Sequence, residues 1–552
     1  MKIVIVGGVA GGASAAARAR RLNEDAEIIM FERGEFISFA NCGLPYHVSN
    51  VIPERSSLLV MTPPKFKAQT NIDVRILHEV TKINRDKKTV AVRNLHTGES
   101  LEESYDKLIL ATGSSPVRPP IPGADDPDVM TLWTIPDMDR IRGRLDDGAK
   151  NAVVIGGGFI GLEVAENLRE RGVDVSVVEM LPQVLPPLDP EMAVSVKQEF
   201  ENHDVDVRLS QKVTEIRRPE NDTQVSPQLE IDLEGGKQLV TDLVILSIGV
   251  RPNNELATDA GLDLGQRGGI QTNDRMQTSD PNIYAVGDVD EVTDIIRDCP
   301  TQIPLAGPAN RQARIAADNI LGRDSRYRGT LGTSVVKIFD LTAANTGANE
   351  KTLQKDDIEY RKIYIHPANH AGYYPGATPI SLKLLFAPEG RVLGAQAVGR
   401  NGVDKRIDVI STAILAGQTI YDLENLELAY APPYGSAKDP VNFAGMVAGN
   451  ALRGDSTLIH ADSIPEDALL LDVREEDEYA EGHLDEAVLI PVGQLRDRLD
   501  ELPRDRHIAV YCKVGLRGYL AERILKQEGY DASNLSGGYI TYCMYRDAGM
   551  LS

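Results

Sequence analysis

The sequence predicts a multidomain α/β protein built largely from parallel sheets. The chain has 552 residues, more than the roughly 250 to 300 residues at which a single hydrophobic core stops growing. Short runs rich in Val and Ile alternate with helical stretches, as in parallel sheets, and two runs lead directly into glycine-rich turns. The runs expected to form these strands cover residues 2–6, 26–31, 152–155, 173–178 and 243–248.

Composition and charge argue against some classes of protein. The chain is 42% apolar and 26% charged, and its 59 Lys and Arg residues face 82 Asp and Glu residues, a net charge of -23. So acidic a chain disfavours nucleic-acid binding through a basic surface. No apolar run approaches the roughly 20 residues that cross a bilayer, and residue 1 leads directly into the first expected strand. We therefore expect a cytoplasmic protein with no nucleic-acid or membrane partner.

The cysteines are few and widely spaced. Cys42, Cys299, Cys512 and Cys543 share no CxxC spacing, and four are too few for a disulfide framework or a zinc knuckle. We expect no metal site. A cysteine that has a function here is expected to be a free, reactive thiol.

The first glycine-rich turn, residues 7–12, reads Gly-Gly-Val-Ala-Gly-Gly. Such a turn lets backbone N–H groups approach a pyrophosphate where a helix begins. Val9 replaces the middle glycine of the GxGxxG motif, so the segment alone also fits a purely structural strand-to-helix turn. Glu32, at the end of the next strand, is placed to accept hydrogen bonds from a ribose. The predicted nucleotide contacts are Gly7, Val9, Ala10, Gly11, Gly12 and Glu32.

The second turn, residues 155–163, carries the complete motif with Gly156, Gly158 and Gly161. Glu179 ends the following strand, where a carboxylate bonds a free 2'-hydroxyl and repels a 2'-phosphate. We therefore expect NADH to be preferred over NADPH, although neighbouring arginines can override one carboxylate. The predicted contacts are Gly156, Gly158, Phe159, Ile160, Gly161, Glu179 and Gly249.

Three further segments, residues 105–113, 242–249 and 282–288, each end a strand in a small-residue turn, and Asp288 lies at the tip of the last. Together with the two glycine loops they resemble the pyridine nucleotide-disulfide oxidoreductases, flavoproteins with two dinucleotide sites. The resemblance implies that the first loop holds FAD and the second holds NADH. It adds Ala111, Thr112, Gly113, Gly287 and Asp288 to the FAD site.

The chain lacks the CxxxxC pair of many members of this family. Residues 37–46 read instead Ile-Ser-Phe-Ala-Asn-Cys-Gly-Leu-Pro-Tyr. This single cysteine resembles the branch of NADH oxidases, NADH peroxidases and coenzyme A-disulfide reductases, which implies that Cys42 lies against the flavin. A single thiol requires a mixed disulfide with a substrate sulfur. Because the thiolate is the reactive form, we expect dipoles or cations to depress the pKa of Cys42.

The sequence around Cys42 is most similar to that of coenzyme A-disulfide reductases. This resemblance implies coenzyme A as substrate or bound thiol. Those enzymes hold the coenzyme's phosphates with cations from the first helix and from the segment after the cysteine. Solvated surface charge is the alternative for these cations. The implied coenzyme A contacts are Arg18, Arg21, Ser38, Asn41, Lys65 and Lys67.

Residues 369–375 and 428–439 also resemble the dimerisation domain of that group, in which two tyrosines of the partner subunit reach the cysteine. The resemblance implies a homodimer with a shared site to which Tyr373 and Tyr430 contribute. Tyr374 and Tyr434 are the near alternatives, and interface packing is another role for all four. A phenol can hydrogen-bond or protonate a departing thiolate.

Residues 470–474, 481–484, 509–518 and 535–539 occur in the order of a rhodanese domain. Cys512 begins a loop that Arg517 closes as a helix opens. Six backbone amides and the helix dipole are expected to surround its sulfur and to stabilise a thiolate or persulfide. A non-catalytic rhodanese fold is the alternative. Cys299 and Cys543 lack such surroundings and are expected to be structural.

The predicted fold is α/β, with two Rossmann-like dinucleotide-binding domains, an α+β dimerisation domain and a C-terminal α/β rhodanese domain. In the dimerisation domain we expect strands at 334–340, 358–365 and 381–386 and a helix at 403–415. The predicted boundaries are 1–115 with 275–325 for FAD, 150–270 for NAD, 326–450 for dimerisation, 451–465 for a linker and 466–552 for rhodanese.

The resemblance implies an FAD-dependent oxidoreductase that uses NADH to reduce sulfur-sulfur bonds in small molecules. Coenzyme A persulfide, polysulfide and coenzyme A disulfide are the candidate substrates, and the rhodanese domain would handle sulfane sulfur. An NADH oxidase or peroxidase is one alternative, in which Cys42 would become a sulfenic acid. A sulfur-trafficking module is another.

Overall fold

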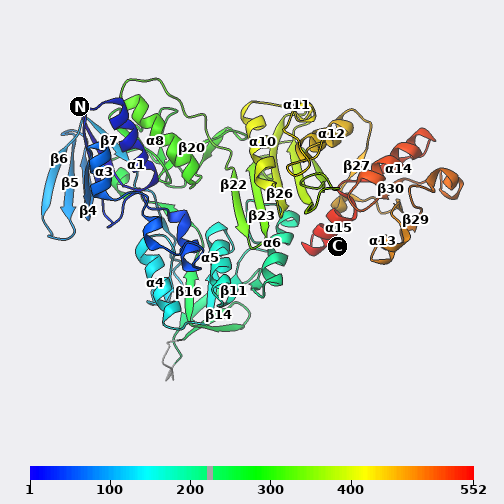
Figure 1. The fold of residues 1–552 in the computed structure, drawn as a ribbon, viewed down its shortest axis with the longest axis horizontal. Helices are drawn as coiled ribbons and strands as arrows, with labels where there is room; N and C mark the ends of the chain where they lie inside the picture. Colours follow the sequence, from blue (N-terminus) through cyan, green and yellow to red (C-terminus); the bar gives the residue numbers. More distant parts are fainter. Residues whose placement is uncertain (220–227, 552) are drawn as a thin grey trace. The chain divides into compact units, whose positions relative to one another are not determined.

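The computed structural model describes residues 1–219 and 228–551. The chain folds into two compact units (Figure 1). Unit one comprises Met1–Met180 and Asp204–Gly332, and unit two comprises Leu181–His203 and Thr333–Ser552. In the described ranges no helix is long and apolar enough to cross a membrane.

A parallel sheet with strand order β19-β7-β1-β2-β3 forms the first half of unit one. Side chains of β1 alternate between two cores: Ile3 and Ile5 pack with helices α1 and α8, whereas Val4 and Val6 pack with strands β4 and β5. Both faces of the sheet are thus covered, as in doubly wound folds. The bounds are β1 Lys2–Val6, α1 Ala10–Leu22, β2 Glu27–Glu32, β3 Asp73–Ile76, β7 Lys107–Leu110, β19 Ile283–Ala285 and α8 Ala306–Ile320.

A second parallel sheet with order β12-β11-β10-β16-β9 repeats this plan. The glycine-rich turn between β10 and α5 occupies the same place as the turn between β1 and α1. The five strands expected from the Val- and Ile-rich runs are all present, within one or two residues at each end. The bounds are β9 Val129–Met130, β10 Asn151–Ile155, α5 Phe159–Glu170, β11 Asp174–Val178, β12 Asp206–Arg208 and β16 Leu243–Leu246.

The remaining elements of unit one are short helices and small sheets around these two. The antiparallel sheets are β4 His78–Asn84, β5 Thr89–Asn94 and β6 Ser100–Ser104, and β13 Val213–Arg217, β14 Leu229–Leu233 and β15 Gln238–Thr241. The others are β8 Ser114–Pro116, β17 Val250–Pro252, β18 Ile270–Gln271, β20 Asp290–Asp294, β21 Cys299–Thr301, η1 Asn41–Gly43, α2 Leu44–Val48, η2 Arg55–Leu58, α3 Pro63–Thr70, α4 Ile135–Asp146 and α7 Glu255–Asp259.

Unit two begins with an antiparallel sheet of order β22-β23-β26-β25-β24, packed with helices α6, α10 and α12. The strand expected at 358–365 starts later, at Arg361, because the amide of Ile358 bonds the Leu353 carbonyl and closes helix α9. The bounds are α6 Pro190–Asn202, β22 Ser334–Ile338, β23 Leu341–Gly347, α9 Glu350–Lys355, β24 Arg361–Ile365, β25 Ile380–Phe386, β26 Val392–Gly399, α10 Val403–Leu415, α11 Ile420–Asn425 and α12 Pro440–Leu452.

Buried ion pairs join the 181–203 segment to this sheet. The Lys383 ammonium donates to Asp189 at 2.7 Å, to Glu191 at 2.6 Å and to Glu350. Three carboxylates thus converge on one point in the way metal ligands do, but the lysine ammonium already occupies that point. Burial opposes the charge of Glu350, yet the Lys383 and Lys362 ammonium groups outweigh it and lower the pKa of Glu350 to about 2.

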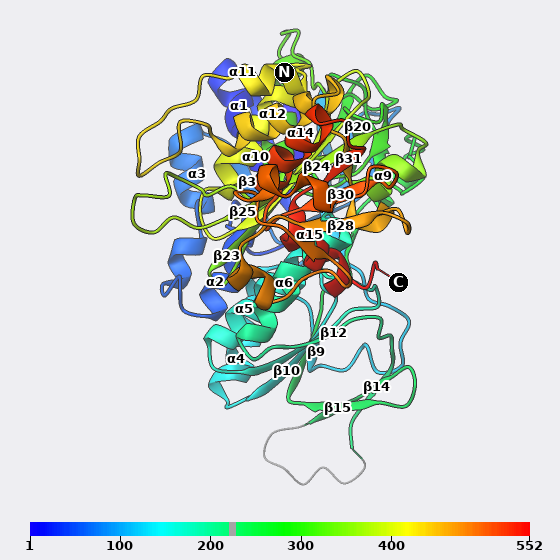
Figure 2. The ribbon, with the colours of Figure 1, turned by 90° about the vertical axis from the view of Figure 1, so that its right-hand side faces the viewer.

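The end of unit two is a parallel sheet of order β27-β31-β30-β28-β29. Within the segment expected to be a linker, Leu458–Ile459 pairs with β31 as the edge strand β27 of this sheet. Helix α15 packs along α6 in both views (Figures 1 and 2). The bounds are β27 Leu458–Ile459, η3 Ala461–Ser463, β28 Leu469–Asp472, α13 Glu476–Ala480, β29 Val488–Leu489, η4 Leu495–Asp497, η5 Leu499–Glu501, β30 Ile508–Tyr511, α14 Leu516–Gln527, β31 Ala532–Leu535 and α15 Gly538–Asp547.

Candidate functional site

The two glycine-rich turns of unit one have nearly the same backbone. Gly7 and Gly156 leave their strands with φ of 103° and 110°, a region that residues with a Cβ rarely adopt. A Cβ on Gly7 would lie 2.1 Å from the Ala111 carbonyl oxygen, and one on Gly156 would lie 2.4 Å from the Ser247 carbonyl oxygen. Each turn therefore requires glycine at its first position.

The middle position of the motif tolerates a side chain. Val9 has φ of -94° and caps α1, and Gly158 at the matching place before α5 has φ of -83°. Neither φ lies in the left-handed region that favours glycine, so the middle position does not require glycine on account of a positive φ. The other motif residues begin the two helices: Ala10, Gly11 and Gly12 in α1, and Phe159, Ile160 and Gly161 in α5.

The strand-end acids Glu32 and Glu179 are held against their glycine loops. The Gly8 amide donates to Glu32 Oε2, and the Gly157 amide donates to Glu179 Oε2, each at 2.7 Å. The two predicted ribose-binding carboxylates therefore occupy matching positions in the two halves of unit one.

The small-residue turns lie at the ends of neighbouring strands. Ala111, Thr112 and Gly113 follow β7, and the Ala111 amide bonds the Val6 carbonyl at the end of β1. The Gly287 amide donates to Gln312 Oε1 at 2.8 Å. Since parallel strands bring their carboxyl ends to one edge, these turns and the first glycine loop share an edge. Gly249, in the other half, follows β16 and its carbonyl accepts from the Val117 amide.

Asp288 lies at the tip of the 282–288 turn. Its Oδ2 accepts a hydrogen bond of 2.7 Å from the Ser114 hydroxyl. Burial raises the pKa of Asp288, so the protein alone does not compensate this carboxylate fully. A bound group with hydroxyl donors would do so.

Cys42 lies in the turn η1, on a segment that contacts the first glycine loop and helix α5. Before the cysteine, the Ser38 amide donates to the Gly8 carbonyl at 2.9 Å. After it, the Tyr46 hydroxyl donates to Glu163 Oε1 on α5 at 3.3 Å. The segment of Cys42 is therefore held between the first glycine loop and the helix that follows the second.

The expected depression of the Cys42 pKa is not found. Partial desolvation, and then the carboxylates of Glu163 and Asp288, raise the pKa of Cys42. The expected dipoles and cations do not outweigh the desolvation and the two carboxylates. The Asn41 side chain lies 3.8 Å from the sulfur. The Cys42 side chain is exposed in the single chain. The groups of unit one around Cys42 therefore favour the protonated thiol.

Glu163 and Tyr46 are site residues that the sequence did not identify as such. Burial raises the pKa of Glu163 to about 7, against the lowering effect of the Tyr46 hydrogen bond. The carboxyl group thus titrates near neutral pH beside the cysteine. Both residues lie at the ends of the segments 37–46 and 155–163, but their contact joins positions 117 apart, which motif spacing does not predict.

The four predicted phosphate-binding cations differ in their surroundings. Arg18 is committed to an ion pair of 2.7 Å with Asp318 and its side chain is only 12% exposed, so the structure does not support a free phosphate contact there. Arg21 lies exposed at the next-to-last position of α1, and Lys65 and Lys67 are exposed on α3. Three cations thus remain available on the surface of unit one.

The predicted tyrosine pair forms a contact in unit two. The Tyr373 and Tyr430 hydroxyls lie 2.9 Å apart. The side chains are 76% and 49% exposed, and the alternatives Tyr374 and Tyr434 are 42% and 73% exposed. A cluster of four exposed tyrosines is unusual for large aromatic side chains, which lie mostly inside proteins or at interfaces.

Cys512 follows β30 and is fully buried at the start of the loop before α14. Within the described ranges one backbone amide donates to its sulfur, that of Gly515, at 3.1 Å. The expected nest of six amides is therefore not formed as six hydrogen bonds. All four cysteines are free thiols, and Cys299 and Cys543 are partly exposed in β21 and α15.

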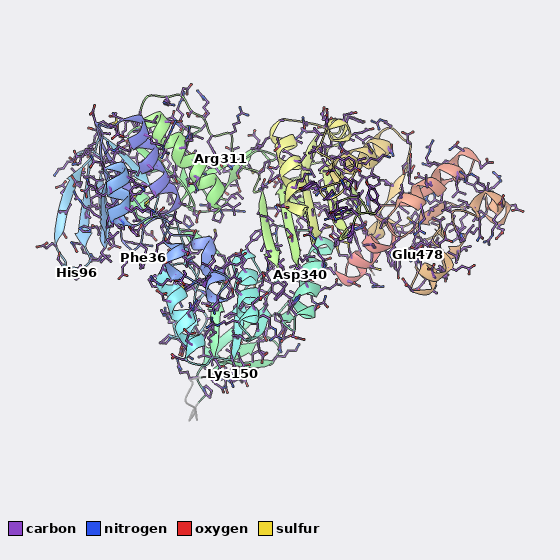
Figure 3. All side chains as sticks on the ribbon, viewed as in Figure 1. Phe36, His96, Lys150, Arg311, Asp340 and Glu478 are labelled. Atoms are coloured by element: carbon purple, nitrogen blue, oxygen red, sulfur yellow. The ribbon has the colours of Figure 1, made fainter. Side chains whose placement is uncertain are left out.

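Arg517 lies in the first turn of α14 and is held by a neighbour that the sequence did not reveal. Its guanidinium donates two bonds, of 2.6 and 2.7 Å, to the Glu478 carboxylate of α13. Glu478 is labelled in Figure 3. These bonds lower the pKa of Glu478 to about 2. The same bonds raise the pKa of Arg517, and the nearby Cys512 sulfur adds to the shift. The predicted loop-closing arginine is thus fixed next to the thiol.

Comparisons with family models agree with this division of the chain. Residues 1–313 match the pyridine nucleotide-disulphide oxidoreductase family, residues 333–439 match its dimerisation domain, and residues 458–544 match the rhodanese-like domain. The predicted fold class, with two dinucleotide-binding parts, a dimerisation domain and a rhodanese domain, is confirmed.

Curated and solved relatives cover most or all of the chain. A coenzyme A disulfide reductase of Staphylococcus haemolyticus is 39% identical over 450 residues, 81% of this chain and 99% of that protein. A solved structure of reduced Bacillus anthracis CoADR-RHD is 49% identical, with a TM-score of 0.95 over 98% of each chain. An NAD-dependent persulfide reductase from A. fulgidus is 40% identical, with a TM-score of 0.92 over 98% of this chain and 100% of that one.

These matches confirm the prediction of an oxidoreductase with a fused rhodanese domain. The family match spans more than half of the 552 residues, and the curated relative is covered almost completely. The chain belongs to the pyridine nucleotide-disulphide oxidoreductase family.

Proposed function

We propose that this oxidoreductase uses NADH to reduce the sulfur-sulfur bond of a small persulfide, with Cys42 as the reacting thiol. The observation that carries the proposal is the position of the Cys42 segment, which bonds the first glycine loop through Ser38 and the helix of the second through Tyr46. The names of the relatives support the substrate class, since one is a coenzyme A disulfide reductase and another a persulfide reductase.

The residues of unit one fit FAD at the first loop and NADH at the second. Gly113, Gly158 and Gly249 have open space where a Cβ would lie, so a nucleotide can approach the backbone there. We assign Glu32, Gly287 and Asp288 to FAD and Glu179 to the NADH ribose. When bound, the flavin would take a hydride from the nicotinamide and supply its electron pair to the sulfur next to Cys42.

The proposed reduction of a persulfide proceeds through a mixed disulfide with Cys42. The Cys42 thiolate attacks the sulfur bound to R in a persulfide RSSH, forms a Cys42–S–S–R bond and expels hydrosulfide. Two electrons from NADH then cleave this bond into the Cys42 thiolate and the thiolate RS⁻. The sum is NADH, a proton and RSSH giving NAD⁺, RSH and H₂S. We assign Glu163 the role of holding and releasing a proton at its carboxyl oxygens beside this site.

We propose coenzyme A as R. The exposed cations Arg21, Lys65 and Lys67 suit its phosphates, and Ser38 and Asn41 lie in the cysteine segment itself. The proposed homodimer would cover the exposed tyrosines, with Tyr373 and Tyr430 reaching the partner's cysteine. The dimerisation-domain match supports this assembly. The cytoplasmic location stays a prediction.

For the rhodanese domain we propose transfer of sulfane sulfur on Cys512. The Gly515 amide and the fixed guanidinium of Arg517 favour an anionic sulfur there. Polysulfide or another bulky donor would load this cysteine, whereas a small persulfide would reach Cys42 directly.

Steady-state oxidation of NADH across a set of acceptors tests the proposal. The set comprises coenzyme A persulfide, coenzyme A disulfide, glutathione persulfide, inorganic polysulfide and hydrogen peroxide. We expect the highest kcat/KM with a persulfide or disulfide, together with release of sulfide from persulfides. Turnover with peroxide alone would replace the proposal by an NADH peroxidase, and no turnover with any acceptor would favour a sulfur-trafficking role.

A further inference from the structure

Strand β24 of the dimerisation domain contacts the rhodanese domain through buried polar groups. The Tyr364 amide donates to the Ser536 hydroxyl at 3.0 Å, and His366 Nε2 lies 2.8 Å from the Thr541 hydroxyl. The Tyr364 hydroxyl lies 2.8 Å from that of Tyr545. All five side chains are at least nine-tenths buried. Hydrogen bonds in such a setting fix geometry, because breaking one leaves an unpaired polar group inside the protein.

The His366 ring is neutral in its contact with the rhodanese domain. Burial lowers its pKa to about 4, so at neutral pH the ring has one N–H donor and one acceptor nitrogen. Its Nδ1 lies 2.9 Å from the Ser381 hydroxyl, opposite the contact to Thr541. Because a hydroxyl can donate or accept, Thr541 matches either tautomer. The contact is therefore retained throughout the physiological pH range.

The segment 536–541 that β24 holds also supports the loop that carries Cys512. The Tyr539 amide donates to the Cys512 carbonyl at 2.8 Å, and the Ile540 amide donates to the Lys513 carbonyl at 3.1 Å. These carbonyls belong to the two residues that open the loop. The backbone next to the sulfur is thus anchored to the first turn of α15.

The segment is closely packed against β24 on one side and against the Cys512 loop on the other. A Cβ on Gly538 would lie 2.3 Å from the Cys512 carbonyl oxygen, and one on Gly537 would lie 2.0 Å from the Thr541 hydroxyl and 2.8 Å from Tyr364 Cβ. Gly537 therefore packs closely against Tyr364 of β24, and Gly538 packs closely against the backbone of the Cys512 loop.

We propose that Tyr364 and His366 of the dimerisation domain are positioning residues for the sulfur site at Cys512, and that they act through the segment 536–541. The hydrogen bond from the Gly515 amide to the sulfur depends on the loop geometry that this segment sets. The effect of these residues on sulfur transfer rests on the function proposed for Cys512. Their effect on the geometry of the Cys512 loop can be measured without turnover.

A pair of substitutions at Thr541 separates the hydrogen bond from packing. Thr541→Val keeps the shape and loses the hydroxyl, and Thr541→Ser keeps the hydroxyl. In the full-length Cys42→Ser background, we expect Thr541→Val to lower kcat/KM for sulfur transfer from thiosulfate to cyanide about fivefold, the effect of one net hydrogen bond. Thr541→Ser is expected to stay within about twofold of its parent.

Two controls locate the effect. Thr457→Val also removes a hydroxyl, at the residue before β27, which accepts from Lys526 at the surface. It is expected to leave transfer unchanged. With Cys42 intact, Thr541→Val is expected to keep the wild-type rate of NADH-dependent disulfide reduction. A general loss of fold would lower that rate too.

Hydrogen exchange of the amides at 512–519 and 538–541 provides the readout without turnover. We expect exchange to quicken in Thr541→Val but not in Thr541→Ser or Thr457→Val. A further variant, His366→Leu, is expected to reproduce Thr541→Val, and the double variant to be no worse than either. Wild-type transfer and exchange in Thr541→Val, or additive losses in the double variant, would overturn the positioning role. Absence of transfer in the parent protein would instead contradict the proposed function of Cys512, and the exchange comparison would still decide the positioning.

Discussion

Tyr46 donates a hydrogen bond of 3.3 Å to Glu163 and so joins the segment of Cys42 to the helix that follows the second glycine loop. Burial raises the pKa of Glu163 to about 7, and its carboxylate in turn raises the pKa of Cys42. The pKa of the Cys42 thiol is thus coupled to the charge of one partly buried carboxyl group.

Removing that charge is expected to make Cys42 more reactive. In the NADH-reduced protein we expect Glu163→Gln to speed alkylation of Cys42 about three- to tenfold at pH 8, because the pKa of the thiol falls when a nearby negative charge is lost. Below pH 6 Glu163 is protonated in the wild type, so the difference is expected to vanish. The measurement is the alkylation rate between pH 5.5 and 8.5, followed by mass spectrometry.

The control for this charge is Glu170→Gln, the same substitution at the exposed end of α5. It is expected to behave as the wild type at every pH. Equal alkylation rates of Glu163→Gln and the wild type throughout the range would remove Glu163 from the thiol's surroundings.

Glu179 is expected to set the preference for NADH. Its carboxylate, held by the Gly157 amide, would accept from a 2'-hydroxyl and repel a 2'-phosphate. We expect Glu179→Gln to lower the ratio of kcat/KM for NADH to that for NADPH by about tenfold, the effect of roughly 1.4 kcal/mol.

Glu32→Gln is the matched control, since Glu32 makes the same contact with the Gly8 amide in the first loop. It is expected to weaken flavin retention while leaving the NADH to NADPH ratio unchanged. The role assigned to Glu179 fails if both variants keep the wild-type ratio.

The purified protein is expected to be yellow and to release FAD on denaturation. Burial raises the pKa of Asp288, and a donor on the cofactor would stabilise the carboxylate. Asp288→Leu is therefore expected to lower the FAD content several-fold, measured by chromatography of the released flavin. A folded wild-type protein without flavin, or an Asp288→Leu variant with full FAD content, would disprove the assignment.

Cys512→Ser is expected to abolish sulfur transfer from thiosulfate or polysulfide but to spare most of the reduction of a small persulfide. The sulfur that the Gly515 amide contacts would be lost, whereas Cys42 would be untouched. Paired kinetics of the variant and the wild type on both substrates provide the check. Indistinguishable rates on both would mean that the rhodanese domain takes no part in turnover.

Most of the fold was predictable because the sequence features that specify its strands and turns lie within short segments. Val- and Ile-rich runs predict the strands of the two parallel sheets, and the positive φ of Gly7 and Gly156 is a property of each turn alone. The edge strand at Leu458–Ile459 was missed because two residues with no periodic pattern become a strand only by pairing with β31.

The contacts that tune the site were not predictable from spacing. Glu163 meets Tyr46 across 117 positions, and Glu478 meets Arg517 across 39. Arg18 was assigned to a phosphate from the family resemblance, and the sequence did not reveal its partner Asp318, 300 positions away. Electrostatic properties depend on such distant neighbours and on burial, which one sequence does not specify.

Substitution of Cys42 tests the central claim most directly. Cys42→Ser is expected to abolish NADH-dependent reduction of coenzyme A persulfide and coenzyme A disulfide, because no mixed disulfide can form. The same variant is expected to retain rapid bleaching of its flavin by NADH in stopped-flow measurements, since hydride transfer does not use the thiol. Retained turnover of both sulfur substrates by Cys42→Ser would contradict the account.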